Sequence, residues 1–159
     1  MEGASSGRIP RLRTQSSHYN LIMEREVSPT SDWLGTAQRF FPELVEENQE
    51  WVDSMYLLWI MLRLAFEEAY KSNPRNNDRI ARTYRFAKWC LTQPRGLSAE
   101  DDWLTCVCVC FYEHIPEFEP SFNDITNWIS SSDFDDLKDT FKYHISTEKF
   151  AELETKFHP

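Results

Sequence analysis

The apolar stretch from Met55 to Phe66 is the feature that most restricts the fold of this chain. Residues 55–62 would place apolar side chains on every side of a helix, and Arg63 is the single charge in the stretch. A helix that is apolar all round is expected at the centre of a helical domain. The stretch is roughly 12 residues long, whereas a helix that crosses a bilayer needs about 20. We therefore predict a buried central helix over residues 52–71, ended by Asn73-Pro74.

Apolar stripes and capping residues predict seven further helices. Ile80, Tyr84, Ala87 and Leu91 recur at i, i+4, i+7 and i+11, which is the spacing of one helix face. A serine followed by aspartate three residues later predicts helix starts at Ser98, Ser121 and Ser132. Thr30 or Ser31 and Ser146 are further expected caps. The predicted segments are 32–41, 43–50, 77–92, 98–114, 122–129, 132–145 and 147–157.

These helices predict an all-α fold class, as an irregular helical bundle or a short α-α solenoid-like array of about seven or eight helices. The chain has only four glycines, and hairpin-rich β folds usually need more. Residues 104–111 leave one alternative open. Their β-branched and cysteine side chains are compatible with an isolated strand, but no other segment is available to pair with it.

Domain organisation follows from where the apolar spacing begins. Residues 1–30 are rich in Gly, Ser, Arg and Pro without a sustained apolar period, so we predict a disordered or poorly ordered tail. Residues 31–159 are predicted to form a single helical domain. Six Trp, eleven Phe and six Tyr bring enough apolar area for a core of that size.

The charge balance limits the classes of partner. The chain has 17 basic and 26 acidic residues and a net charge of -9. The first 30 residues contribute four arginines against three glutamates, so the predicted domain carries about -10. A field of that sign repels phosphate backbones, which disfavours nucleic acid as a partner. No apolar signal-peptide core or membrane span is found, so a cytoplasmic protein is expected.

The four cysteines are Cys90, Cys106, Cys108 and Cys110. Their spacing lacks the CxxC pairs typical of zinc sites, and Val, Leu and Phe surround them. We predict buried, chemically inert thiols, with metal or redox use and disulfide pairing as the alternatives.

No motif typical of an enzyme is present. The four histidines form neither HExxH nor ExxH patterns, and glycine-rich phosphate loops and GxSxG are missing, so no catalytic residue, cofactor or metal ligand is predicted. Glu67-Glu68 is interpreted as a solvated helix end. Glu113-His114 has two interpretations: an acid–base or binding site, or a histidine stabilised at a helix C-terminus beside a surface glutamate. The second is preferred.

Charged residues also follow the helix spacing in residues 75–88. Basic side chains recur there along one side of the helix, at Arg75, Arg79, Arg82, Arg85 and Lys88. One interpretation is a basic face for an acidic partner, and the other is internal pairing with neighbouring acids. In a domain this acidic, internal pairing is preferred.

Part of the sequence resembles a known group of proteins. Glu100-Asp101-Asp102-Trp103-Leu104 leads into an apolar segment from Val109 to Ile115, followed by Leu137…Phe141 and Phe150…Leu153. From about residue 82 to 157 the chain is similar to a family of small, uncharacterised, acidic bacterial helical proteins. That family loosely resembles the immunity-type proteins that accompany bacterial toxins. The resemblance implies protein binding and supplies no catalytic residues.

The functional prediction is a non-catalytic protein-binding domain, an immunity protein that neutralises a basic toxin domain through an acidic surface. The alternatives are a structural or adaptor module that binds through Arg75 to Lys88, and an enzyme using Glu113 and His114. The predicted partner-binding residues are six acids near helix starts and loop junctions: Asp101, Asp102, Glu117, Glu119, Asp135 and Asp136.

Overall fold

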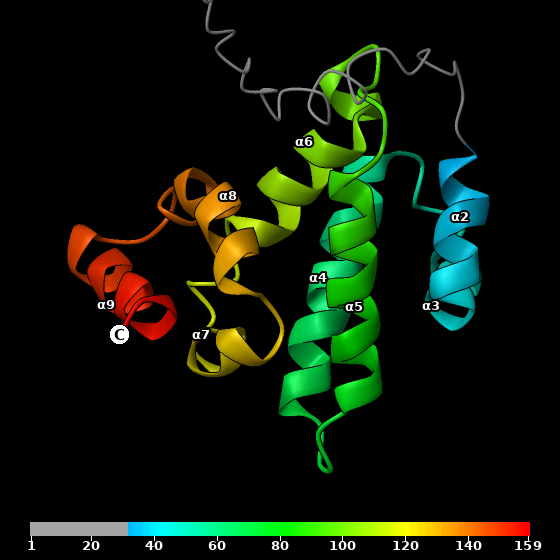
Figure 1. Cartoon of the computed structure of the whole chain (residues 1–159). Coiled ribbons are helices and arrows are strands. Elements are labelled where there is room, and N and C mark those ends of the chain that lie inside the picture. Colours follow the sequence, from blue (N-terminus) through cyan, green and yellow to red (C-terminus); the bar gives the residue numbers. More distant parts are fainter. Residues whose placement is uncertain (1–31) are drawn as a thin grey trace, which may run out of the picture.

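The computed structural model describes residues 32–159, so the predicted tail over residues 1–30 lies outside the described part of the chain. Residues 32–159 form an all-α bundle of eight α-helices without a β-strand, which confirms the predicted fold class (Figure 1). The α-helices are α2 (Trp33–Phe40), α3 (Pro42–Asn48), α4 (Met55–Lys71), α5 (Asn77–Leu91), α6 (Trp103–Val107), α7 (Glu119–Asp124), α8 (Ser131–Phe141) and α9 (Thr147–Phe157). Short 3-10 turns are η1 (Ala99–Asp101) and η3 (Ile125–Asn127), and a π-helical turn, η2 (Cys108–Tyr112), follows α6. No helix in residues 32–159 has the length and apolarity needed to cross a membrane.

Helices α4 and α5 run side by side through the middle of the domain (Figure 1). The Trp59 ring of α4 lies fully buried between Phe86 of α5 and Phe111 of η2, with ring centroids 5.3 and 5.4 Å away. The predicted buried central helix is confirmed, and eight residues of α4 are buried. Its burial is not complete on every side, because Leu64 is 51% exposed. The helix instead packs through one broad face. Figure 1 shows α2 and α3 on one side of the α4–α5 pair and α7, α8 and α9 on the other.

Most of the predicted core is confirmed. Trp59, Leu62, Phe66, Tyr84 and Phe111 are all buried. Leu91 and Leu104 are only half-buried.

The segment with two interpretations, residues 104–111, is helical, so the alternative of an isolated strand is wrong. The predicted start of that helix also changes. Ser98 makes no capping bond to the backbone, whereas the Asp102 carboxylate accepts a hydrogen bond from the Thr105 N–H at 3.0 Å and caps α6. Gly96 lies so close to this turn that a Cβ there would collide with the Asp101 carbonyl, so the tight approach requires glycine.

Two other predicted caps are wrong and one is confirmed. Helix α7 starts at Glu119, and Ser121 lies buried inside it, donating its hydroxyl proton to the carbonyls of Ile115 and Phe118 at 2.7 and 2.9 Å. Helix α8 is capped by Ser130 rather than Ser132, because the Ser130 Oγ accepts the Asp133 N–H at 3.1 Å. Ser146 caps α9 as predicted.

The first helix is capped by Asp32, whose carboxylate accepts the Gly35 N–H at 2.8 Å. Thr30 and Ser31, the caps expected from the sequence, lie outside the described residues.

Candidate functional site

The six acids predicted to bind a partner lie on three separate elements. Asp101 is in η1, Glu117 and Glu119 flank the start of α7, and Asp135 and Asp136 are in α8. These five are exposed. They supply charge to different parts of the surface rather than forming one tight cluster.

The structure differs from the prediction at Asp102, the sixth acid. This residue is 2% exposed, so it contributes to the fold instead of a binding surface. Besides capping α6, its carboxylate accepts the Gly96 N–H at 2.8 Å and pairs with the Arg95 guanidinium at 3.1 Å. Burial alone would raise the pKa of Asp102. The hydrogen bonds from Thr105 and Gly96, together with Arg95, outweigh that effect and hold the pKa below its usual value.

Some of the remaining acids have partners within the domain. Glu117 lies 2.6 Å from His114 Nδ1, and Glu119 lies 3.6 Å from Lys149 Nζ. Asp135 contacts both Lys138 and His158. Asp101 and Asp136 form no ion pair with any residue in 32–159.

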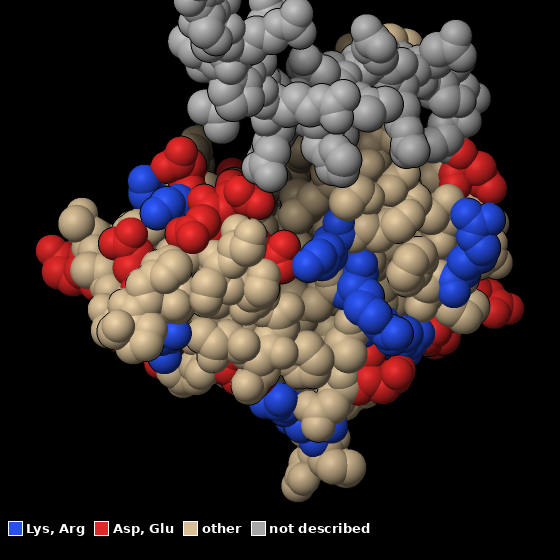
Figure 2. Space-filling view, in the orientation of Figure 1, with Lys and Arg blue, Asp and Glu red and all other residues tan. Residues whose placement is uncertain are grey.

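The described surface has many more free acids than free bases. Most Lys and Arg side chains in residues 32–159 form ion pairs, and the exceptions are Arg39, Arg85 and Lys156. About half of the carboxylates have no basic partner there: Asp32, Glu46, Glu47, Glu50, Asp53, Glu100, Asp101, Asp136, Glu148, Glu152 and Glu154. Figure 2 shows acidic atoms gathered on the α8–α9 side and a band of basic atoms along α5.

One group of free acids was missed by the sequence analysis. Glu46, Glu47 and Glu50 lie in and just after α3, and Asp53 precedes α4; all are exposed. Their close spacing was visible in the sequence. The prediction favoured acids near the first turns of later helices and so passed over this group.

The basic face of α5 is largely occupied by internal partners. Arg75 pairs with Asp124 at 2.9 Å, and Lys88 pairs with Asp133 at 2.8 Å. Arg82 lies 2.8 Å from Glu43, which Arg79 also approaches at 3.8 Å. The hydrogen bond from Arg82 is the main reason why the pKa of Glu43 is lowered. Internal pairing is therefore confirmed for four of the five positions, and Arg85 alone has no carboxylate partner within residues 32–159.

Glu113 and His114 do not pair with each other. Glu113 contacts His144 Nε2 at 3.2 Å, His114 contacts Glu117, and the two imidazole rings stack with centroids 4.7 Å apart. The cluster joins the end of η2 to the connection between α8 and α9. No group of three His, Cys, Asp or Glu side chains in residues 32–159 is arranged to hold a metal ion.

Glu67 and Glu68 have the role expected from the sequence. Glu67 pairs with Arg63 at 3.6 Å and Glu68 with Lys71 at 3.1 Å, both on the surface of the same helix. Such pairs are typical of a solvated helix face.

All four cysteines are free thiols, and the predicted burial is confirmed for Cys90, Cys106 and Cys110, whereas Cys108 is half-buried. Burial raises the pKa of Cys106 to about 12 and that of Cys110 to about 11. The thiolate is the reactive form of cysteine, so these side chains are inert at neutral pH.

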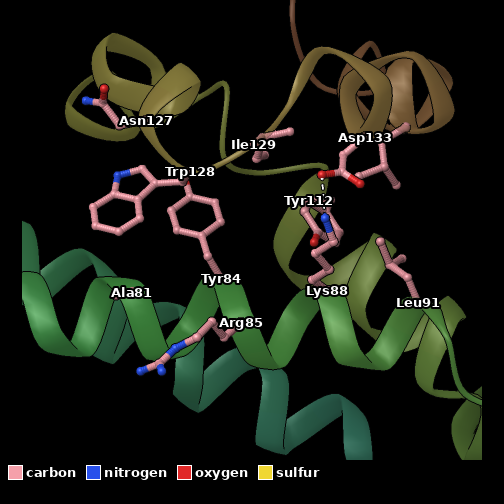
Figure 3. A pocket seen from close by; sticks show the side chains of 11 residues that line it. Ala81, Tyr84, Arg85, Lys88, Leu91, Tyr112, Asn127, Trp128, Ile129 and Asp133 are labelled. Atoms are coloured by element: carbon pink, nitrogen blue, oxygen red, sulfur yellow. Dashed lines mark hydrogen bonds and ion pairs between the residues drawn. The ribbon is translucent and has the colours of Figure 1, made fainter.

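A pocket of about 260 Å³ opens between α5, α8 and the segment after η3 (Figure 3). Tyr84 and Trp128 form one wall, with nearly parallel rings 5.6 Å apart. The other apolar lining comes from Ala81, Leu91, Ile129 and Leu137. Arg85, the Lys88–Asp133 ion pair, Asn127 and Tyr112 add polar groups. The pocket was not predicted from the sequence, because its lining comes from four segments (α5, η2, η3 with the residues after it, and α8) that only the folded chain brings together.

Comparison of the chain with protein families, with curated proteins and with solved structures finds no match in any of the three. The resemblance of residues 82–157 to immunity-type proteins therefore stays a prediction.

Proposed function

We propose that residues 32–159 form a non-catalytic, cytoplasmic protein-binding domain that recognises a basic protein through its acidic surface. The observation that carries this proposal is the imbalance of free charge: most Lys and Arg side chains in residues 32–159 are paired, while about half of the carboxylates are not. The domain has a net charge of about -10, so its excess acid faces solvent instead of being neutralised internally.

A surface of this kind is suited to fast capture of a basic partner. Complementary charge raises the association rate and has less effect on the dissociation rate once the complex forms. Toxins that act on nucleic acid need a basic active site to hold phosphate groups, and an acidic protein can occlude such a site. An immunity protein that neutralises a bacterial toxin is the specific form of the proposal, and the sequence resemblance supports it.

The association surface is assigned to Asp101, Glu117, Glu119, Asp135 and Asp136. Asp102 is left out because it is buried. Asp135 is kept but is left unmutated, because it has two partners, Lys138 at 3.5 Å and His158 at 3.1 Å.

The test is a charge reversal of Asp101, Glu117, Glu119 and Asp136 to lysine, with association measured against the protein encoded by the neighbouring gene. At low salt we expect the association rate constant to fall by about 10-fold or more, with the dissociation rate constant changing by less than about 3-fold. The difference should shrink at high salt, because screening weakens long-range attraction.

The matched control reverses Glu46, Glu47, Glu50 and Asp53, which changes the net charge by the same amount elsewhere on the surface. If both variants associate equally slowly, only net charge matters and the assigned residues are not the binding surface. Association that ignores salt and both reversals contradicts the electrostatic proposal as a whole.

The adaptor alternative predicts a different pattern. Binding through the α5 face would be weakened by Arg85→Glu, which removes the one base of that face that lacks an internal partner in the described chain. The acidic-surface proposal predicts that the same variant binds the basic partner as fast as the wild type or faster.

A further inference from the structure

The pocket between α5, the segment after η3, and α8 has the chemistry of a site for a small organic anion. We propose that it binds a monocarboxylic acid with a single-ring or short branched apolar body. This site is independent of the acidic association surface.

The size and walls of the pocket define the apolar part of the ligand. Its volume of about 260 Å³ is below the roughly 300–1,000 Å³ of sites for drug-sized ligands. Leu91, Ile129 and Leu137 line it together with the stacked Tyr84 and Trp128 rings, which Figure 3 shows beside each other. Space of that size and polarity suits one ring or a short branched chain, not a nucleotide or a larger cofactor.

Tyr112 supplies an unused hydrogen-bond donor to the pocket. It is 3% exposed, and its hydroxyl makes no hydrogen bond to another residue in 32–159. Figure 3 shows the Tyr112 side chain beside that of Lys88 at the foot of the pocket. Burial raises the pKa of Tyr112, so the phenol stays protonated and donates. The hydroxyl therefore lies in the lining of the pocket with its proton available to a ligand oxygen.

The charge lining the pocket differs in sign from that of the whole domain. Asp133 is the single carboxylate in the lining, and Lys88 neutralises it at a distance of 2.8 Å. Arg85 also lines the pocket and has no carboxylate partner in residues 32–159, so the lining carries one unpaired positive charge. A carboxylate is attracted there, and an organic cation would meet no free acid.

The local backbone also sets this region apart. Tyr112 ends the π-helical turn η2, and π-turns inside helices occur frequently at functional sites. A π-turn rotates the residues after it relative to a regular α-helix. Tyr112 of this turn is one of the residues that line the pocket.

The test is an NMR titration of the isotope-labelled full chain with 3-phenylpropionate, read at the Trp128 indole N–H, which donates to Asp124 at 3.2 Å. We expect saturable shifts with a dissociation constant on the order of 1 mM or tighter. The neutral analogue 3-phenylpropanol should bind about 10-fold more weakly, because it lacks the charge that strengthens hydrogen bonds.

Two variants assign the polar contacts, and a third serves as the control. Tyr112→Phe keeps the ring and should weaken binding of the acid by about 10-fold. Arg85→Ala should weaken it by about 2- to 5-fold, with a larger effect at low salt. Arg39→Ala removes a base of α2 that also has no carboxylate partner in residues 32–159, and it should leave the affinity unchanged.

Several results would overturn the proposal. They are the absence of saturable Trp128 shifts, equal affinity for the acid and the alcohol, and unchanged binding in Tyr112→Phe.

A last experiment uses the peptide Gly-Gly-Phe with a free C-terminal carboxylate. If that peptide binds and 3-phenylpropionate does not, the pocket recognises a polypeptide chain end and the assignment to a small acid is wrong.

Discussion

The α4–α5 pair and the α8–α9 pair are held in the domain by different kinds of contact. Helices α4 and α5 share a continuous aromatic core, in which Trp59, Phe66, Phe86 and Phe111 lie with ring centroids about 5 Å apart and are all buried. Helices α8 and α9 have a smaller aromatic core of their own, centred on Phe134, whose ring stacks on that of Phe157 at 4.3 Å.

Charged side chains contribute more to the contacts between the α8–α9 pair and the rest of the domain than they do to the contacts within the α4–α5 pair. The Lys149 and Lys156 ammonium groups of α9 lie over the Phe122 ring of α7, each 4.8 Å from its centroid. Two aromatic contacts, Tyr112 to Phe141 at 6.0 Å and His114 to His144 at 4.7 Å, accompany three ion pairs. These are Lys88 to Asp133, Glu113 to His144 and Glu119 to Lys149. Exposed ion pairs contribute little stability and are screened by salt. The α8–α9 pair is therefore expected to be the less stable region, although both pairs have fully buried rings.

The largest effect should come from the central pair. Trp59→Ala removes a fully buried indole that contacts both Phe86 and Phe111, so we expect the free energy of unfolding to fall by about 3–5 kcal/mol. Urea denaturation measures it. The control is Trp51→Ala, which truncates an indole that is 44% exposed and should cost less than about 1 kcal/mol. Similar losses in the two variants would show that α4 and α5 are not the stable centre.

A smaller and more local effect is expected in the C-terminal pair. Phe134→Ala opens the core between α8 and α9 and should lower the free energy of unfolding by about 3 kcal/mol. Hydrogen exchange should show lost amide protection in α8 and α9, while α4 and α5 keep theirs at low denaturant. Equal loss of protection in all four helices would mean that the two regions unfold as one unit.

The sequence predicted the helices well where one apolar stripe is long. Residues 77–92 and 147–157 were expected, and α5 and α9 occupy Asn77–Leu91 and Thr147–Phe157. Capping residues were harder. The run Ser130-Ser131-Ser132-Asp133 continues with Phe134-Asp135, so it allows a serine–aspartate pair in two registers. Burial of Phe134 selects the Ser130 register, and that burial depends on contacts with α9.

The candidate sites depend on tertiary contacts that single segments do not reveal. Asp102 belongs to an acidic run that is expected to face solvent. It is nevertheless buried at the start of α6, where the Gly96 N–H and the Arg95 guanidinium contact its carboxylate. The pairing of the α5 bases was inferred correctly from the domain's excess acid. Their partners Glu43, Asp124 and Asp133 come from three other elements, so the free position, Arg85, could be identified only in the folded chain.

The smallest effect tests the charged link between the two regions. Asp133 pairs with Lys88 at 2.8 Å and accepts the Ser130 hydroxyl proton at 2.7 Å. Partial burial would raise the pKa of Asp133, but the hydrogen bonds from Lys88 and Ser130 outweigh it and hold the pKa below the ordinary 3.8.

A carboxylate whose pKa is depressed in the folded state stabilises the protein above its unfolded-state pKa, and that stabilisation is lost as the pH falls through the folded-state pKa. Asp133→Asn should therefore lower the free energy of unfolding by about 0.5–1 kcal/mol at pH 7, because water screens the exposed Lys88 end of the pair, and by less at pH 3. Asp136→Asn is the control, because Asp136 lies on the same helix without an ion pair in residues 32–159 and should change the free energy by less than about 0.5 kcal/mol. An Asp133→Asn effect of the same size at both pH values would show that the Lys88 ion pair does not help to hold α8 against α5.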